Sequence, residues 1–355
     1  MEIRVPWRAR TAAYTIYQHS RSLLSRLTTN KRHGLAISFY CNYHQATGST
    51  VAIASIANHL ATIHNVDAYI EPLSSYTRLL ELNVRQYPSP ERLAGKLVFV
   101  DIEQDNRAVE ALARDGHCVI LTCHALPTVL HNVPQDQLIR NLELSSWIHF
   151  VSHSQRLAFI EHYPQINIEQ KSFYIPNYTR QSTKSTTTGN VGIVGHLNRK
   201  VKNALEGIQL AQQSDARLIQ CWGSNTIAGL ENHKLYSKLR INGWANSTSD
   251  MHDSFDVLVS TSQFESFGLV VVEALSAGIP CVLSDIPVFR ELFADCSGVA
   301  IITGNDRQDI QAINDFLAQA AELKDEIIEF WESRFSDESI NAKWQDKLEH
   351  ISRHT

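Results

Sequence analysis

The stretch DVLVSTSQFESFGLVVVEALSAGIPCVLSD (256–285) contains a strand, a helix and a second strand in sequence order. DVLVSTS (256–262) and PCVLSD (280–285) are short apolar runs rich in β-branched residues, which is typical of buried strands. The helical segment between them ends near Gly278, and Pro280 follows as a stop. A strand–helix–strand order of this kind is typical of a parallel sheet, so the stretch predicts an α/β protein.

Two carboxylates in this stretch predict a polar site. Glu265 lies in the loop before the helix, which Gly268 opens and which Ser262 or Ser266 could cap. Glu273 lies about two turns inside the helix, among apolar residues. Burying a carboxylate there is costly unless it is hydrogen-bonded. The hydroxyls of a ligand ribose would satisfy it, and so would an Arg or Lys elsewhere in the chain, so both alternatives stay open.

Positive charge is expected in two loops, each of which follows a predicted strand. The helix that follows Gly268 turns the positive end of its dipole and its first backbone N–H groups toward the loop, which suits a phosphate or a sugar hydroxyl. Earlier in the chain, the glycine-ended strand VGIVG (191–195) is followed by three basic residues, Arg199, Lys200 and Lys202. Cations at the carboxyl end of a strand can neutralise a diphosphate leaving group. A solvated basic turn is the alternative.

The strand–helix alternation extends over most of the chain. The first half contains six further strand-like runs: GLAISFYC (34–41), DAYIEP (67–72), LVFVDI (97–102), CVILTCHA (118–125), WIHFVS (147–152) and SFYIPN (172–177). The segment TRQSTKSTTTGN (179–190) is rich in Ser and Thr, which is typical of a linker. The alternation restarts at residue 191 and includes RLIQCWG (217–223) and KLRINGW (238–244). We therefore expect two doubly wound parallel sheets.

These motifs resemble those of family 4 glycosyltransferases. FESFGLVVVEA (264–274) is similar to the E-x7-E signature of that family, and GIPCV (278–282) follows it with the family's spacing. SFYIPN, FVSHS (150–154) and GIVGHLNRKVKN (192–203) resemble the strand before its linker, its V-S-x-S stretch and its diphosphate clamp. The resemblance covers roughly residues 34–350, strongly in the second half and weakly in the first.

The resemblance implies a GT-B fold, in which two Rossmann-like, doubly wound parallel-sheet domains face each other across a cleft and a C-terminal helix returns to the first domain. The implied segments are a basic amphipathic N-terminal segment (1–33), an N-terminal acceptor domain (34–178), the linker (179–190), a C-terminal nucleotide-sugar donor domain (191–330) and a C-terminal helix crossing back (331–355).

The family's functional residues carry over as follows. Glu265 would contact the hydroxyls of the donor sugar, and Glu273 would hold the ribose. Backbone contacts to the sugar or phosphate would come from Phe267, Gly268 and Leu269. The diphosphate clamp would follow Gly195 and use Arg199 and Lys202, with Lys200 as a third candidate. In the first domain, the resemblance places Gly48 and Ser49 in the loop that closes on the phosphates and His124 near the reacting sugar.

This sequence departs from the family in two places. His196 follows the strand glycine where the family often has Arg, so which of the nearby basic residues clamp the diphosphate stays open. The first-domain loop contains only Gly48, although the family's loop is usually richer in glycine. No D-x-D motif occurs in the chain. The resemblance implies transfer with retention, from a nucleotide-diphosphate sugar to a glycan or lipid-linked acceptor. Because Arg199 and Lys202 could take the place of a metal on the diphosphate, we expect no metal or other cofactor.

The composition of the chain limits the kinds of partner and the cellular location that we expect for the protein. The net charge of -5 does not favour nucleic-acid binding. The first 33 residues contain seven basic residues but a single acidic one, Glu2, and residues 11–27 have helical apolar spacing. This predicts an amphipathic helix that either docks on an anionic membrane surface or packs on the domain. The sequence context of the six cysteines indicates buried thiols, and no signal peptide or membrane-spanning run is visible. We therefore expect a cytoplasmic protein. If the amphipathic helix docks on a membrane, the protein would be peripheral on the inner membrane face.

Two other classes of function remain as alternatives. A catalytically inactive relative could bind nucleotide sugars as a membrane-associated protein, although retention of both glutamates and of the basic cluster argues against this. A dinucleotide-dependent oxidoreductase would need G-x-G-x-x-G. The glycines of GNVGIVG (189–195) are spaced G-x-x-G-x-x-G instead.

Overall fold

The computed structural model describes residues 34–42, 48–70, 79–87, 89–130, 132–230 and 236–354. Within these residues the chain forms two compact units. The first unit contains residues 34–151, 156–175 and 344–354, and the second contains residues 152–155 and 176–343. The amphipathic helix expected within residues 1–33 lies outside the described residues.

The first unit is built on a seven-stranded sheet in the order β3-β2-β1-β4-β5-β6-β7, in which every neighbouring pair is parallel. Its strands are β1 (Ala36–Cys41), β2 (Asn65–Ile70), β3 (Arg85–Tyr87), β4 (Leu97–Asp101), β5 (Cys118–Cys123), β6 (Trp147–Phe150) and β7 (Ser172–Tyr174). Every residue of β4 and β5 is buried. These central strands are mostly apolar because helices cover both faces of the sheet.

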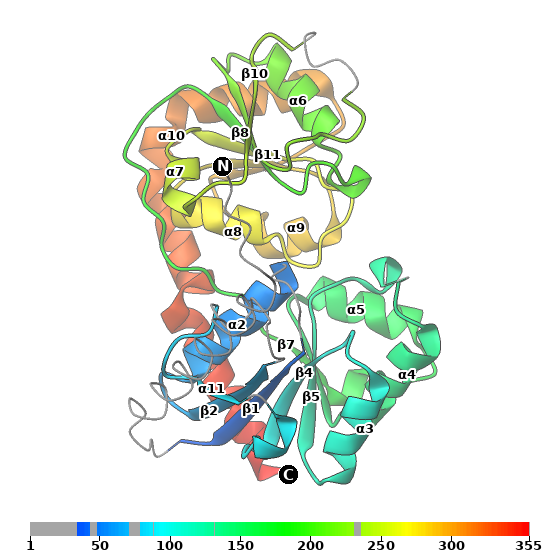
Figure 1. Cartoon of the computed structure of the whole chain (residues 1–355). Coiled ribbons are helices and arrows are strands. Elements are labelled where there is room, and N and C mark those ends of the chain that lie inside the picture. Colours follow the sequence, from blue (N-terminus) through cyan, green and yellow to red (C-terminus); the bar gives the residue numbers. More distant parts are fainter. Residues whose placement is uncertain are drawn as a thin grey trace, which may run out of the picture. The chain divides into compact units, whose positions relative to one another are not determined.

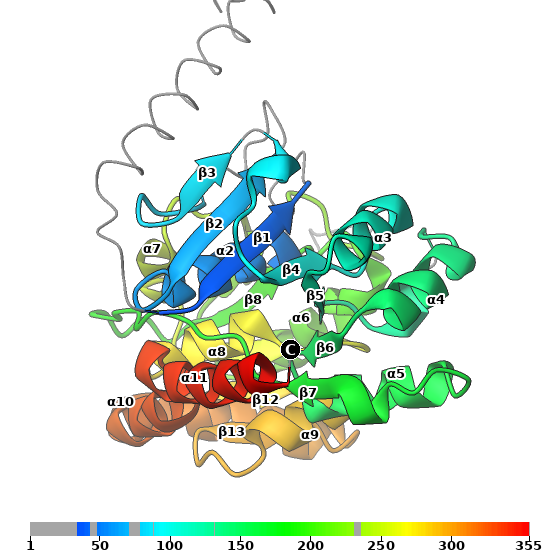
Figure 2. The ribbon, with the colours of Figure 1, turned by 90° about the horizontal axis from the view of Figure 1, so that it is seen from below.

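Helices cover both faces of this sheet (Figure 2). They are α2 (Gly48–Leu60), α3 (Asn106–Arg114), α4 (Gln135–Leu144), α5 (His153–His162) and α11 (Asp337–Arg353), with short 3-10 turns at Pro90–Arg92, Pro127–Val129 and Glu169–Lys171. Val98 and Val100 pack with residues of α3. Phe99, between them, points to the opposite face and meets Trp344 of α11, with ring centroids 5.6 Å apart. The alternation of side chains along β4 therefore assigns α3 and α11 to opposite faces.

The second unit is built on a six-stranded parallel sheet in the order β10-β9-β8-β11-β12-β13. Its strands are β8 (Val191–Gly195), β9 (Ile219–Gly223), β10 (Leu239–Gly243), β11 (Val257–Ser260), β12 (Cys281–Leu283) and β13 (Val299–Ile301). Its helices are η5 (Lys200–Lys202), α6 (Ala204–Gln213), α7 (Thr248–His252), α8 (Leu269–Ser276), α9 (Pro287–Phe293) and α10 (Asp306–Phe335). The long α10 packs against both α6 and α8 (Figure 1).

The expected fold is confirmed in its components: two Rossmann-like parallel sheets and a C-terminal helix, α11, which belongs to the first unit from Trp344 on. The helical pattern from residue 308 to residue 351 forms two helices, α10 and α11, which are separated at Ser336. The strands β3 and β13 were not expected: the residues RQY of β3 form no apolar run, and the short apolar run that contains β13 was not singled out. No helix among the described residues is long and apolar enough to span a bilayer. All six cysteines are free and buried.

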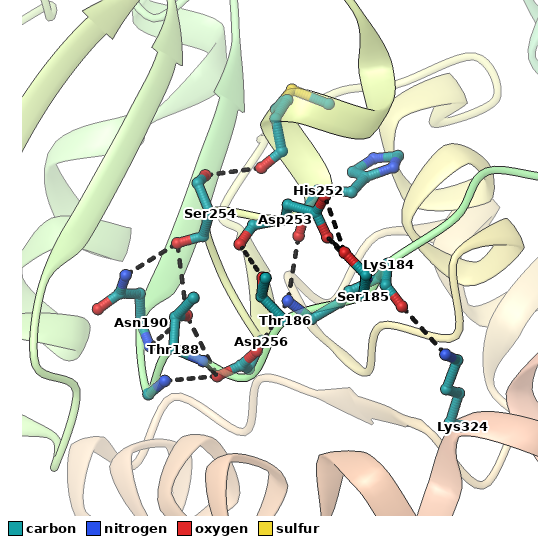
Figure 3. A network of polar contacts seen from close by, with 12 residues as sticks. Lys184, Ser185, Thr186, Thr188, Asn190, His252, Asp253, Ser254, Asp256 and Lys324 are labelled. Carbon is teal, nitrogen blue, oxygen red and sulfur yellow. Dashed lines mark hydrogen bonds and ion pairs between the residues drawn. The ribbon is translucent and has the colours of Figure 1, made fainter.

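The Ser- and Thr-rich segment 179–190 has neither helix nor strand, yet it is bound to the second unit (Figure 3). Lys184 forms an ion pair with Asp256, with 2.8 Å between Nζ and Oδ1, and both side chains are almost fully buried. The backbone N–H of Thr188 donates to Oδ2 of the same aspartate at 2.7 Å. Asp253 accepts a hydrogen bond from the N–H of Ser185, also at 2.7 Å. These contacts hold residues 184–188 along the start of β11.

Candidate functional site

Two loops of the second unit meet at the carboxyl ends of neighbouring strands. One loop follows β8 and the other follows β11, and these two strands pair in the sheet. The N–H of Gln263 donates to the carbonyl of Val201 at 2.8 Å, and the hydroxyl of Thr261 donates to the carbonyl of Asn203 at the same distance. The basic turn after β8 is therefore attached to the loop that carries Glu265, as ligand sites in α/β sheets require.

Lys202 and Glu265 form an ion pair at this junction. Lys202 Nζ lies 2.5 Å from Glu265 Oε1, and the hydroxyl of Ser262 donates to the same oxygen at 2.9 Å. The lysine and glutamate side chains are 20% and 18% exposed. The expected sugar-contacting carboxylate and the expected diphosphate-clamping cation are thus held together in the structure.

Further basic residues follow β8 beside this pair. Burial lowers the pKa of His196, and the positive charges of Arg199 and Lys202 lower it further. Arg199 and Lys200 are exposed to solvent, and Gly195 ends β8 with a positive φ of 137°. The carboxyl end of β8 therefore presents positive charge toward solvent, which suits an anionic ligand.

An aromatic side chain not singled out from the sequence lies beside this cluster. Trp244 directly follows β10, and 61% of its surface is exposed. Its ring meets His196 edge-on, with centroids 4.8 Å apart. A tryptophan so exposed at the carboxyl end of a strand offers a flat apolar face to a ligand. Its only sequence signal is its place at the end of the predicted strand 238–244.

The helix α8 begins differently from the expectation. Gly268 is its N-cap, with φ of 92°, so neither Ser262 nor Ser266 occupies the N-cap position expected for one of them. Ser262 is committed to Glu265 instead. The would-be Cβ of Gly268 lies 2.7 Å from Cε1 of Phe289, so glycine is required here both by its backbone and by packing.

Phe267, the residue before this glycine, serves the core. Its side chain is 3% exposed and meets Phe335 of α10, with ring centroids 6.0 Å apart. Leu269 then opens the helix. Backbone groups of Phe267, Gly268 and Leu269 are therefore the parts suited to a ligand at this helix start.

Glu273 is the fifth residue of α8, closer to the helix start than the two turns expected. Its side chain is partly reached by solvent. Protein atoms crowd the carboxyl enough for burial to raise its pKa to about 7. No ion pair to Glu273 is found among the described residues, so the Arg or Lys alternative has no support there. A crowded carboxyl with an open side is suited to accept hydroxyl groups from outside.

The remaining expected site residues belong to the first unit. Gly48 and Ser49 begin α2, and His124 directly follows β5. Burial lowers the pKa of His124 to about 3, with a smaller contribution from His149. The ring of His124 is therefore neutral at physiological pH.

A second set of contacts, also missed from the sequence, supports the loop of Glu265. The hydroxyl of Ser152 donates to the carbonyl of Ser266 at 2.8 Å. Glu291 of α9 accepts hydrogen bonds from the N–H groups of His153 and Ser154, at 2.8 and 2.6 Å. The V-S-x-S resemblance marked this stretch, but only the structure shows that its serine holds the neighbour of Glu265. No cluster of three or more potential metal ligands occurs within the part of the chain that the structure describes.

Comparison with known proteins is consistent with this geometry. Residues 175–333 match the model of the family described as glycosyl transferases group 1. Poly(ribitol-phosphate) alpha-N-acetylglucosaminyltransferase of Staphylococcus aureus is 24% identical over 227 residues, which cover 58% of this chain and 44% of that protein. The O-antigen biosynthesis glycosyltransferase WclY of Escherichia coli is 25% identical over 129 residues, 36% of each chain. The chain thus spans less than half the length of these curated relatives.

The solved structures confirm the fold. Anabaena HepE, crystallised in complex with UDP, superposes with a TM-score of 0.71 at 16% sequence identity. The superposition covers 89% of this chain and 100% of HepE. At this identity the likeness concerns the fold alone.

Proposed function

We propose that the chain, whose residues 175–333 match the model of the group 1 glycosyl transferases, moves a hexose-type sugar from a nucleoside-diphosphate sugar to a glycan or lipid-linked acceptor, with retention of anomeric configuration. Two relatives with this similarity are named for transfer to poly(ribitol-phosphate) and for O-antigen biosynthesis, and HepE was crystallised with UDP. These names support a role in the assembly of surface polysaccharide or glycolipid.

One observation carries the proposal: the ion pair between Lys202 and Glu265 lies in the same matched domain as Glu273, the crowded carboxyl of α8. A diphosphate needs a cation, a sugar needs a carboxylate to orient its hydroxyls, and a ribose needs a further acceptor. The three side chains supply one group for each part of a nucleotide sugar.

In the proposed reaction, donor binding separates the ion pair. Lys202 and Arg199 neutralise the diphosphate, which gains negative charge as the bond to the sugar breaks. Glu265 orients the sugar hydroxyls while the anomeric carbon becomes cation-like, as in glycoside hydrolysis. The acceptor attacks on the face that the diphosphate leaves, and the departing phosphate takes the acceptor proton. No metal or other cofactor takes part in this scheme.

The other expected residues receive supporting roles. Backbone N–H groups at the start of α8 contact the sugar or phosphate. Glu273 holds the ribose, and Trp244 offers its exposed face to the base, because base–aromatic stacking contributes about 1–3 kcal/mol. In the first unit, Gly48 and Ser49 close on the phosphates and His124 faces the reacting sugar.

We further propose a cytoplasmic location, in contact with the anionic inner face of a membrane through residues 1–33. The six buried free thiols and the basic composition of that segment support this. Co-sedimentation with vesicles that contain an anionic lipid measures the contact. Equal sedimentation of the full chain and of a chain lacking residues 1–33 would count against it.

Release of UDP from a panel of UDP-sugars tests the activity, with anomeric configuration read by NMR on a transfer product. We expect one donor to be hydrolysed slowly, equally with and without EDTA. Glu265→Gln should lower kcat by about 100-fold or more, as loss of a group that stabilises the transition state does. Glu110→Gln is the matched control, because Glu110 is also ion-paired, to Arg140, but is exposed on the first unit.

The outcomes separate the candidate functions. UDP binding without turnover of any donor or acceptor would favour a binding protein over a transferase. Equal kcat for Glu265→Gln and the wild-type chain would remove Glu265 from the mechanism. If the chain neither binds nor hydrolyses any nucleotide sugar, the proposal is refuted altogether.

A further inference from the structure

A hydrogen-bonded chain of side chains lies at the carboxyl end of the first unit's sheet. Thr122 of β5 is buried, and its hydroxyl lies 3.3 Å from Nε2 of His124 and 2.9 Å from Nδ1 of His149. His149 lies on the neighbouring strand β6 and is fully buried. Its Nε2 lies 2.9 Å from the carbonyl oxygen of Ile175. Thr122 therefore connects the expected site histidine to a second histidine in the core.

The chemistry of these groups determines the direction of every hydrogen bond. A backbone carbonyl only accepts, so Nε2 of His149 must carry the proton that it donates to Ile175. Nδ1 of a neutral His149 is then an acceptor, and the hydroxyl of Thr122 donates to it. The single hydroxyl proton of Thr122 is thereby used. The bond to His124 must then run the other way, from Nε2–H of His124 to the oxygen of Thr122.

We propose that Thr122 and His149 are positioning residues that hold His124 as its Nε2–H tautomer for the reaction of the sugar substrates. This inference rests on the proposed function for its substrate, but the tautomer follows from the first unit alone. In neutral imidazole, the bond made by one nitrogen sets the role of the other.

Burial supports the neutral state on which this argument depends. Burial lowers the pKa of His149 to about 4, although its bond to Ile175 acts in the opposite direction. The pKa of His124 is about 3, lowered by burial and then by His149. Both rings are therefore neutral above about pH 5, across the range in which the chain would act.

The helix α11 closes the core end of this chain. The ring centroid of Trp344 lies 4.8 Å from that of His149, and the ring centroid of Phe173 lies 5.4 Å from it. These rings enclose His149 in apolar surroundings, where an unmade hydrogen bond is costly. The bonds to Ile175 and Thr122 are thus strongly favoured over alternatives, so the direction of the hydrogen bonds persists.

The tautomer can be measured directly on the full chain labelled with ¹⁵N-histidine. Two-bond ¹H–¹⁵N correlation spectra distinguish Nε2–H from Nδ1–H rings, and a His124→Gln variant assigns the signals of His124. We expect Nε2–H in the wild-type chain at pH 7.5 and in Thr122→Ser, which keeps the hydroxyl. Thr122→Val removes the hydroxyl at equal size and should give a mixture of tautomers.

The wild-type spectrum alone can overturn the inference, since an Nδ1–H ring at His124 contradicts it whether or not any variant folds. An unchanged Nε2–H signal in Thr122→Val would also contradict it. Where Thr122→Val does not fold, Thr122→Ala makes the same test by removing the hydroxyl without adding bulk.

Kinetics connect the tautomer to the reaction. Thr122→Val should lower kcat for hydrolysis of the preferred UDP-sugar by about 10- to 100-fold, the usual effect of removing a partner that orients a functional histidine. KM for the donor should stay within about twofold, and Thr122→Ser should retain most of the rate, because KM would change if donor binding were lost instead. A shifted tautomer with unchanged kcat would overturn the catalytic part of the inference. If the wild-type chain neither binds nor hydrolyses any nucleotide sugar, the proposed function is refuted. The spectra then still decide whether His124 has the inferred tautomer.

Discussion

At the scale of single residues, Glu273 is the clearest sign that α8 serves a ligand. A helix so apolar would gain stability from a neutral side chain at this position, yet it carries a carboxyl whose pKa burial raises to about 7. Among the described residues, no ion-pair partner offsets the cost of burying this carboxyl. Groups of this kind are found where a site needs an acceptor prepared for its ligand.

The raised pKa leads to a pH-dependent stability prediction. An acid whose pKa is higher in the folded state stabilises the protein below its unfolded pKa and loses that contribution as pH rises through about 7. Glu273→Gln should therefore raise the free energy of unfolding at pH 8 by about 1–3 kcal/mol, or several degrees in Tm. At pH 5 the difference should be small.

Thermal unfolding of the ligand-free chain at both pH values measures this effect. Glu329→Gln is the control, because Glu329 is exposed on α10 and should show little change at either pH. A stabilisation of equal size at pH 5 and pH 8 would show that the Glu273 carboxyl is not the cause.

At the scale of elements, the segment 184–188 is anchored by an ion pair and hydrogen bonds although its composition is typical of a flexible linker. Its main anchor is Asp256, at the start of β11 (Figure 3). Burial alone would raise the pKa of Asp256, but hydrogen bonds from Lys184 and from the N–H groups of Gly189 and Thr188 lower it overall. The network stabilises the folded state above the unfolded pKa and is lost as pH falls through the folded one.

Breaking this network should cost much of the stability of the second unit. Asp256→Asn leaves Lys184 buried without its counter-ion, which should lower the free energy of unfolding by about 3–5 kcal/mol at pH 7. Asp253→Asn is the matched control, because Asp253 binds the same segment through Ser185 but is exposed. Urea unfolding should show a much smaller change for Asp253→Asn. Similar losses for the two variants would mean that burial of the ion pair is unimportant.

At the scale of the whole molecule, the C-terminal helices divide their tryptophans between two cores. Trp331 of α10 donates from its indole N–H to the hydroxyl of Thr179 at 2.9 Å, within the second unit. Trp344 of α11 packs on Phe99 and Phe173 within the first. Both are almost fully buried. Each unit therefore depends on a side chain from the last part of the sequence.

Hydrogen exchange of the full chain tests this division. Trp344→Ala should lower stability by about 3–5 kcal/mol, because a large buried side chain is removed. Amide protection should fall in β4, β6 and β7 first. Trp331→Ala should reduce protection in the second unit instead. Equal loss over both units in either variant would indicate that they unfold as one body.

The sequence predicted the strands and helices that repeat over many residues, because buried parallel strands are apolar throughout and the helices between them are periodic. It also pointed to Glu265, Glu273 and the basic turn through their unusual surroundings. It did not reveal β3, whose residues RQY form no apolar run, or β13. Nor did it reveal the anchoring of residues 184–188, which depends on an aspartate some seventy residues later.

What the sequence by itself determined is the α/β class, the two successive sheets and the positions of the charged groups, because each follows from the order and spacing of nearby residues. Only the tertiary structure decided which of these groups meet. Lys202 and Glu265 are 63 residues apart, and Thr122 and His149 are 27 apart. They meet because parallel pairing brings the ends of neighbouring strands to one edge of a sheet, and pairing of strands is a property of the folded chain that local spacing does not contain.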